Sequence, residues 1–355
     1  MNPRIKKVRE RIDHYGLDAF FVSSIPHIRY LFGFTGSNAL AVISPALAVV
    51  ITDRRYDVQA KQQVRNAEVI IARRLLYDEL AEIAKRLPGI RIGLEAAHLS
   101  VKDYHDLKKC LPQFKFVATE RIVEGITAVK EPHEIEKIAE AARICCQVME
   151  VVRGIIKPGI SELDISAEIS YQAMRLGSER DPFEPIVASG TRSALPHGIS
   201  TQKAVQEGDL IVLDFGATIA GYAADFTRTA VVGEPSEKQL ELAEVVRQAL
   251  EAAEAAARPD LTGQALDKVA RDVLTERGYG AYFQHSLGHG LGLNVHELPR
   301  IGETATESLQ AGNVITLEPG VYIPDFGGVR IEDDFVLTTG GVRNLTPYSR
   351  QLLNT

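Results

Sequence analysis

The sequence contains one short unit twice, and this internal repeat constrains the fold more than any other feature of the chain. Residues 208–216 read GDLIVLDFG and residues 312–320 read GNVITLEPG, so that glycines, apolar residues and one acid occupy matching positions. The first acid is Asp214 and its counterpart is Glu318. The match continues into AADFTRTAVVG and RIEDDFVLTTG, in which Asp225 and Glu332 each stand eight residues before a glycine. The repeat therefore predicts two related halves that each contribute two acids.

The predicted position of these acids indicates a metal site. Each unit is expected to place one acid at the end of an apolar strand and the other in the following strand. An ionised carboxylate buried at the end of a strand destabilises the fold by several kcal/mol unless it is paired or binds a metal. If the two halves pack face to face, four carboxylates meet, and their repulsion favours bound cations. For Glu318 alone, the alternative is a strand end at a surface turn, since Pro-Gly follows it.

A histidine-rich segment lies between the two copies of the repeat. The stretch HSLGHGLGLNVHE, residues 285–297, holds three of the nine histidines of the chain. His285 and His289 have the spacing of a helical zinc pair, but the HExxH glutamate is missing and the intervening glycines oppose a helix. We therefore expect one of these imidazoles to join the four acids. For each histidine taken singly, the alternative is a structural, hydrogen-bonded role.

This set of ligands indicates which ions the site would hold. Carboxylates with a single imidazole favour Mn²⁺, Co²⁺ or Fe²⁺ over a thiolate-type zinc site. The set is larger than one ion needs, so we expect two divalent ions, with manganese favoured and cobalt, iron or zinc as alternatives. Two such ions would generate a hydroxide nucleophile at neutral pH and polarise a carbonyl group, which makes hydrolysis the natural reaction.

Composition and charge exclude other classes of function. The net charge is −7, whereas binding to the phosphate backbone of nucleic acid needs positively charged surface, so we expect no nucleic-acid partner. The N-terminus is charged and has no apolar signal segment, and no apolar run approaches the ~18 residues of a membrane span. We therefore expect a cytoplasmic protein with no membrane partner.

The order of helical and strand-like patterns predicts two domains. Apolar strand-like runs and helical patterns alternate over about the first 120 residues, which predicts an α/β domain over residues 1–122. The pattern weakens over a linker at residues 123–132. Residues 133–355 then combine helices with the duplicated strand pairs, which predicts an α+β domain with internal pseudo-twofold symmetry. Its helices are expected over residues 133–156, from Ser161, from Ser236 to about 257, and over 266–277.

Five ordered motifs now carry a family resemblance. LDFGA, DFTRT, GHGLGLNVHE, LEPGVYIP and GGVRIED resemble those of the M24 metallopeptidases with the pita-bread fold, in the branch of prolidase and aminopeptidase P. The first 120 or so residues resemble the smaller creatinase/prolidase-type N-terminal domain of that branch. Methionine aminopeptidases share the metal ligands but typically lack such a domain, so they fit less well.

The resemblance implies a role for each matching residue. Asp214 would bind one metal ion, His289 and Glu318 the other, and Asp225 and Glu332 would bridge both. Glu318 would also be the general base. The resemblance further implies that His296 stabilises the oxyanion and that His285 lies in the substrate pocket. His197 and Arg300 would contact the substrate. Arg330 and Tyr322 would orient the ligands and the substrate.

The resemblance also implies the substrates and leaves two specificities open. The branch acts on Xaa-Pro dipeptides or on short Xaa-Pro-Yaa peptides, and it suggests a homodimer. Arg300 matches the prolidase position that meets the free carboxylate of a dipeptide, which narrowly favours a dipeptidase over an aminopeptidase. A solvated surface arginine is the alternative for this residue. Metal-free relatives, such as creatinase-like hydrolases or binding modules, should show broken ligand motifs, whereas all five ligand positions here are filled.

Overall fold

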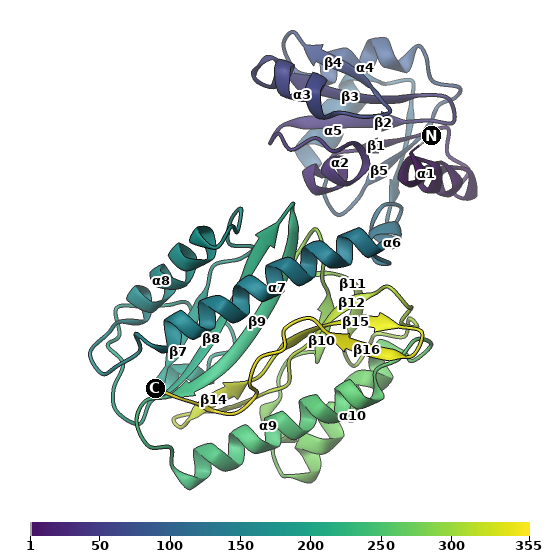
Figure 1. Cartoon of the computed structure of the whole chain (residues 1–355). Helices are drawn as coiled ribbons and strands as arrows, with labels where there is room; N and C mark the ends of the chain where they lie inside the picture. The colour runs from purple at the N-terminus through teal and green to yellow at the C-terminus, as the bar shows by residue number, and fades with distance from the viewer. Residues whose placement is uncertain (1) are drawn as a thin grey trace. The chain divides into compact units, whose positions relative to one another are not determined.

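The computed structural model describes residues 2–355, and its contacts divide the chain into two units, one ending at Thr127 and one beginning at Ala128. Figure 1 shows the elements of both units along the chain. Among residues 2–355, no helix is long and apolar enough to cross a membrane. Each unit is described separately below.

The first unit is built around a six-stranded mixed sheet. The strand order is β4 (Glu68–Ala72), β3 (Ala48–Asp53), β2 (Ala39–Ile43), β1 (Ala19–Val22), β5 (Arg91–Glu95) and β6 (Lys115–Thr119). Strands β1, β2 and β3 pair in antiparallel fashion, whereas β3–β4, β1–β5 and β5–β6 are parallel pairs. The helices are α1 (Pro3–His14), α2 (Ile25–Phe32), α3 (Asp57–Gln63), α4 (Leu76–Ala84), α5 (Val101–Cys110) and α6 (Glu124–Thr127). This α/β architecture confirms the fold class expected for the N-terminal part.

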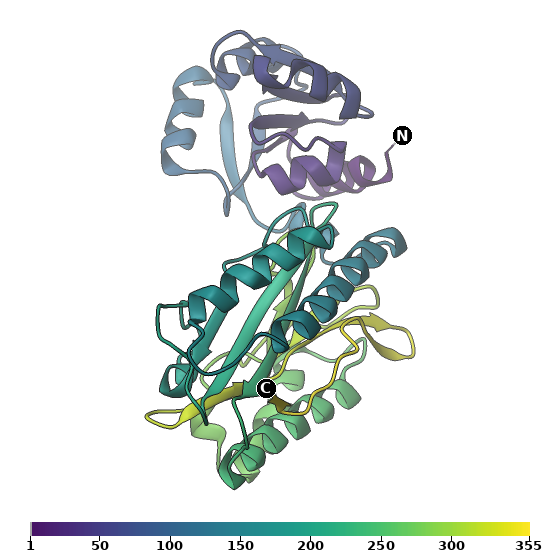
Figure 2. The same cartoon turned by 60° about the vertical axis from the view of Figure 1, so that its left-hand side comes forward.

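The second unit has sheets lined on their outer faces by two pairs of helices. One sheet has the order β17 (Leu353–Asn354), β9 (Tyr222–Val231), β8 (Leu210–Ile219) and β7 (Ile186–Ser189). A second has the order β11 (Glu297–Ile301), β10 (Gly288–Gly290), β12 (Val314–Leu317), β15 (Asp333–Thr338) and β16 (Gly341–Asn344), and β13 (Gly320–Ile323) pairs with β14 (Gly327–Arg330). Helices α7 (Pro132–Arg153) and α8 (Glu162–Arg175) pack on β7, β8 and β9. Helices α9 (Glu237–Ala256) and α10 (Gly263–Glu276) pack against strands of the other sheets, as Figure 2 shows from a second side.

Serine side chains start helices α8 and α9 of the second unit where the sequence predicts them. Ser161 and Ser236 accept hydrogen bonds from Asp164 N and Gln239 N, and each forms a capping box. Helix α10 begins earlier than the apolar pattern predicts. Thr262 accepts a hydrogen bond from the amide of Ala265 and so caps a first turn that carries no apolar stripe.

The two copies of the repeat differ in the continuity of their strands. Strands β8 and β9 each run for ten residues, so Asp214 lies in the middle of its strand. In the second copy, Glu318 follows the last residue of β12 and Glu332 falls between β14 and β15. Two expectations are therefore wrong: Asp214 does not end its strand, and Glu332 does not lie within a strand. Pro319 supplies the physical reason, because its nitrogen has no hydrogen for the sheet ladder, whereas Phe215 at the matching position has one.

Candidate metal centre

The β8–β9 hairpin presents two acids on one face. Asp214 is paired with Thr227 and Gly216 is paired with Asp225 in the antiparallel register. Side chains of paired residues, and of residues two apart, point to the same face of a sheet. Asp214 and Asp225 therefore project together, and both are buried.

A bridge between the two halves of the unit brings Glu332 to this face. Thr227 and Glu332 form an isolated antiparallel bridge, with Glu332 N donating to Thr227 O at 3.1 Å. The Thr227 hydroxyl also donates to Glu332 Oε2 at 2.6 Å. Backbone and side chain together hold this carboxylate beside Asp225.

His289 reaches the site from the short strand β10. A Cβ atom at Gly288 would lie 2.1 Å from Thr316 O, and one at Gly290 would lie 2.1 Å from Leu298 O. Only glycine allows β12 and β11 to approach His289 this closely. His289 lies in a strand, so His285 and His289 do not form a zinc pair on a helix. This agrees with the expectation that the glycines of this segment oppose a helix.

Four of the predicted ligands converge. One ligand atom from each of Asp225, His289 and Glu332 lies within 4.8 Å of the others. His289 Nε2 is 3.4 Å from Glu318 Oε1 and 3.8 Å from Asp225 Oδ2. Residues that lie more than 100 positions apart in the sequence thus form one cluster of oxygen and nitrogen atoms.

Burial and neighbouring charges shift the pKa values of the groups in the cluster. Burial and the neighbouring Glu332 raise the pKa of Asp225 well above its usual range. Burial and the charge of Asp214 raise the pKa of Glu332 to about 8. Burial and the nearby His296 lower the pKa of His289 to about 4, which keeps its imidazole neutral and able to donate a lone pair.

Unpaired oxygen atoms show that the residues fit a metal. Asp214 Oδ1, Asp225 Oδ1, Glu332 Oε1 and Asp334 Oδ1 are buried without a hydrogen-bond partner. Buried carboxylate oxygens in native proteins are normally hydrogen-bonded or bound to a cation. A set of acids with one imidazole matches the donors that Mn²⁺-type ions prefer.

Asp214 connects this cluster to a second group of predicted residues. Arg330 Nη2 donates to Asp214 Oδ2 at 2.5 Å, and Arg330 Nη1 donates to the Tyr322 hydroxyl at 2.8 Å. The Tyr322 hydroxyl lies 2.9 Å from His285 Nε2. One oxygen of Asp214 is therefore held by arginine, and the other is the unpaired atom that can bind a metal.

The remaining predicted residues lie at the exposed side of the site. His296 is exposed, and its ring centroid lies 4.3 Å from that of His289. His197 is exposed on the turn after Pro196, whose carbonyl accepts a hydrogen bond from Arg330. Arg300 is exposed on β11 and is the Cα partner of His289, so its side chain leaves the sheet on the same face.

The structure adds residues that the repeat did not identify. Asp334 accepts a hydrogen bond from Asp225 N at 3.0 Å, and Thr316 Oγ1 accepts one from His289 N at 3.1 Å. Asp334 stands two residues after Glu332, a spacing that could have suggested a shared face. The signal for Thr316 is its position two residues before Glu318, in the strand β12 that Glu318 follows.

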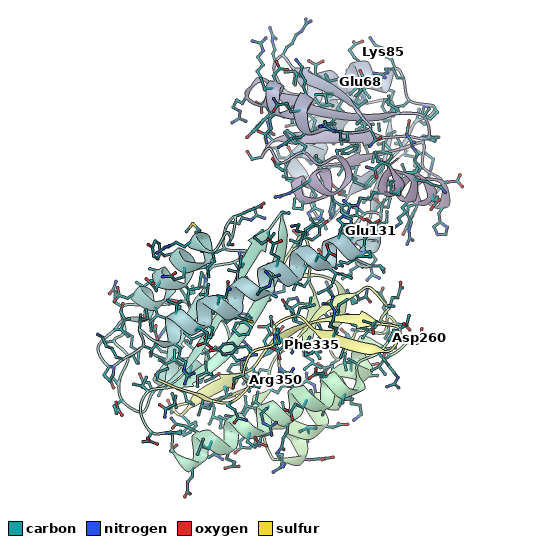
Figure 3. All side chains as sticks on the ribbon, in the orientation of Figure 1. Glu68, Lys85, Glu131, Asp260, Phe335 and Arg350 are labelled. Atoms are coloured by element: carbon teal, nitrogen blue, oxygen red, sulfur yellow. The ribbon has the colours of Figure 1, made fainter. Side chains whose placement is uncertain are left out.

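Arginines fix the segment that carries Glu332. Asp333 accepts hydrogen bonds from Arg228 Nη2 and from Arg350 Nε, both at 2.7 Å. Figure 3 labels Arg350 and Phe335, and the guanidinium carbon lies 5.8 Å from the ring centroid. The two guanidinium groups balance the charge of Asp333, which is fully buried. The side chain of Asp333 therefore faces the arginines, whereas that of Glu332 faces the cluster.

Comparisons with known proteins agree with this site. Residues 136–339 match the model of metallopeptidase family M24, and residues 4–129 match the creatinase/prolidase N-terminal domain. The chain is 39% identical to an uncharacterized peptidase of Bacillus subtilis, YqhT, over 99% of each chain. It resembles the structure of an Xaa-Pro dipeptidase from Bacillus anthracis with a TM-score of 0.97 and 38% identity, over 99% of each chain. The structure of an X-Pro aminopeptidase from Thermotoga maritima matches with a TM-score of 0.90 and 38% identity, over 97% of this chain and 100% of that one.

Proposed function

The chain belongs to metallopeptidase family M24, and from that membership we propose that it hydrolyses the bond between a first residue and proline. The observation that carries this proposal is the convergence of Asp225, His289 and Glu332, with Glu318 beside the histidine. The relatives named Xaa-Pro dipeptidase support the substrate class.

The ligand set can hold two divalent ions. Asp214 would hold one ion, His289 and Glu318 would hold the other, and Asp225 and Glu332 would serve as ligands of both. Ions bound in this way supply a hydroxide nucleophile at neutral pH and polarise the carbonyl group of the substrate. We propose manganese for this site, because carboxylates outnumber nitrogen ligands. The unpaired oxygens of Asp214, Asp225 and Glu332 support the assignment.

The other residues act on protons and on substrate position. Glu318 accepts the proton of the attacking group, since its side chain lies at the edge of the cluster and is 18% exposed. His296 donates a hydrogen bond to the oxygen that becomes negative in the tetrahedral intermediate. His285 and His197 line the substrate side, and Arg330 with Tyr322 orients Asp214 and His285.

Arg300 favours a dipeptidase over an aminopeptidase. Arg300 is paired with His289 in the antiparallel register of β10 and β11. Its guanidinium therefore lies on the same face of the sheet as His289, on the exposed side. A planar guanidinium can bind the free carboxylate of an Xaa-Pro dipeptide in bidentate fashion. The similarity to an X-Pro aminopeptidase structure makes cleavage of longer Xaa-Pro-Yaa peptides the second candidate. The ligand positions are intact, which argues against a metal-free hydrolase or binding module.

One competition experiment tests the proposal. Protein reconstituted with Mn²⁺ is incubated with equal amounts of Ala-Pro and Ala-Pro-Ala, and the free alanine, proline and Pro-Ala are followed by mass spectrometry. Loss of Ala-Pro with little Pro-Ala supports a dipeptidase, whereas release of Pro-Ala with Ala-Pro spared supports an aminopeptidase. Absence of cleavage of both peptides by metal-loaded protein would contradict hydrolysis of Xaa-Pro bonds.

Two further proposals come from the resemblance and the composition. We propose that the chain forms a homodimer, as the family resemblance suggests, and that it acts in the cytoplasm. Sedimentation equilibrium of the full chain tests the first, and cell fractionation tests the second.

A further inference from the structure

The N-terminal unit contains a second cluster of side chains of the types that bind metals, and none of them is among the catalytic residues proposed above. One ligand atom from each of His27, His98 and Glu124 lies within 4.8 Å of the others. His27 is on α2, His98 is on the loop between β5 and α5, and Glu124 is the first residue of α6. Three segments that are distant in the sequence therefore bring two imidazoles and one carboxylate together.

The orientation of His27 is fixed by Glu95. Glu95 Oε2 accepts hydrogen bonds from Ser23 N at 2.5 Å, Ser24 N at 2.7 Å and Ser23 Oγ at 3.0 Å. Its other oxygen lies 2.6 Å from His27 Nδ1 and, as a carboxylate oxygen, accepts a hydrogen bond from the N–H of that nitrogen. A neutral imidazole that donates from Nδ1 carries its lone pair on Nε2.

A carboxylate behind the imidazole is a recurring feature of metal sites. Histidines that bind metals commonly donate their second N–H to a carboxylate, which fixes the tautomer and raises the basicity of the ligand nitrogen. Glu95 and His27 are both buried, with side chains 1% and 2% exposed. Burial and these hydrogen bonds together fix the orientation of the His27 ring.

The other two side chains are spaced for tetrahedral coordination. His98 Nε2 lies 3.6 Å from Glu124 Oε1, which is too long for a good hydrogen bond. Zinc bonds of about 2.0–2.1 Å in a tetrahedron separate neighbouring ligand atoms by about 3.4 Å. The side chains of His98 and Glu124 are 31% and 23% exposed, so water can reach a fourth position.

We propose that His27, His98 and Glu124 bind one divalent transition-metal ion, zinc, in a site separate from the catalytic centre. Two imidazoles and one carboxylate are ligands that suit zinc, whereas Mg²⁺ and Ca²⁺ prefer oxygen alone. The ion links α2, the β5–α5 loop and α6, so it stabilises the N-terminal unit. Water completes the coordination on the exposed side.

Zinc content in the full chain tests this site. The double variant Asp225→Asn, Glu332→Gln removes both bridging acids of the catalytic centre and serves as the background. The background protein, the background with His98→Ala, and the background with Glu124→Gln are dialysed against micromolar zinc and analysed by mass spectrometry of the metal. The matched control is His105→Ala, because His105 is an exposed histidine of the same unit outside the cluster.

The expected result is one zinc ion per background chain, a loss of that ion with His98→Ala or Glu124→Gln, and no loss with His105→Ala. Zinc should also raise the melting temperature of the background protein, but not that of the His98→Ala form. Equal zinc content with and without His98, or no zinc in the background, would overturn the proposal.

A second measurement covers the case in which the background variant does not fold. His98→Ala is then made in the otherwise unchanged chain. The proposal requires total metal content to fall by one ion per chain while the rate of Ala-Pro hydrolysis per active site stays the same. Unchanged metal content would overturn the N-terminal site and leave the peptidase assignment untouched.

Discussion

The hydroxyl group of Thr227 donates a hydrogen bond to Glu332 Oε2 at 2.6 Å, which joins the two halves of the catalytic unit at the carboxylate proposed to bridge both metals. One oxygen of Glu332 is thereby engaged, and the other is buried without a partner.

Replacement of Thr227 by valine should weaken metal binding. The change keeps the β-branched shape but removes the only donor that the side chain offers to Glu332. Loss of such outer partners typically lowers metal affinity or activity about 10–100-fold. Titration with Mn²⁺ measures the affinity. Thr218→Val is the matched control, because the Thr218 hydroxyl, on the same hairpin, is buried without a hydrogen-bond partner. Equal effects of the two changes would contradict the role of Thr227.

The stability of metal-free protein should fall as the pH rises from about 5 to 8. Glu332 has a pKa of about 8 in the fold because of burial and the charge of Asp214, against an ordinary glutamate pKa of 4.5. The folded state therefore holds the proton more tightly than the unfolded state. The resulting stability is fully present below the unfolded pKa and is lost as the pH rises through the folded pKa.

Thermal unfolding of metal-free protein across this pH range measures the effect. Glu332→Gln should reduce the fall, because glutamine has no charge to bury, and excess Mn²⁺ should reverse the fall in wild type. The same pH dependence in wild type and Glu332→Gln would show that other groups govern it.

His296→Ala should lower kcat without loss of metal. The side chain is exposed beside His289 and is not among the proposed ligands, so its removal deletes a donor to the developing oxyanion. Loss of one such donor costs about 10²–10³-fold in kcat. Steady-state kinetics with Ala-Pro and metal analysis of the same sample measure the two quantities. A parallel loss of metal would instead indicate that His296 supports the metal site.

Arg300→Ala should raise KM for Ala-Pro far more than for Ala-Pro-Ala. In the dipeptide the carboxylate directly follows proline, whereas in the tripeptide it is one residue farther from Arg300. Loss of a charge-assisted hydrogen bond of about 1.5–3 kcal/mol corresponds to roughly 10–100-fold in KM. Arg343→Ala, an exposed arginine on β16 of the same sheet, is the control. Equal increases for the two peptides would place Arg300 outside the carboxylate site.

The sequence alone predicted the family, the two-domain fold and the four long helices of the second unit, α7 to α10. The capping residues Ser161 and Ser236 form hydrogen bonds within one helical turn. The start of each of these helices can therefore be predicted from the sequence without knowledge of tertiary contacts. Short elements were harder to predict. Helix α2 has only eight residues and contains Pro26 in its first turn, and β4 has only five residues, one of them an acid.

The proposed catalytic residues were also predicted from the sequence, because the repeat and the ordered motifs are local patterns. Their geometry was not accessible in the same way. Asp214 lies mid-strand, whereas its counterpart Glu318 follows the end of β12, and this difference arises where Pro319 interrupts the second copy.

Only tertiary structure placed His27, His98 and Glu124 together. No spacing in the sequence connects these residues, since each comes from a different element and their neighbours form no motif. The sequence by itself determined which side chains can bind metal and where the serine-capped helices α8 and α9 begin, because these properties depend on residue type and near neighbours. Packing decided which of the side chains meet, because contacts between distant segments follow from how the sheets and helices bury their apolar faces.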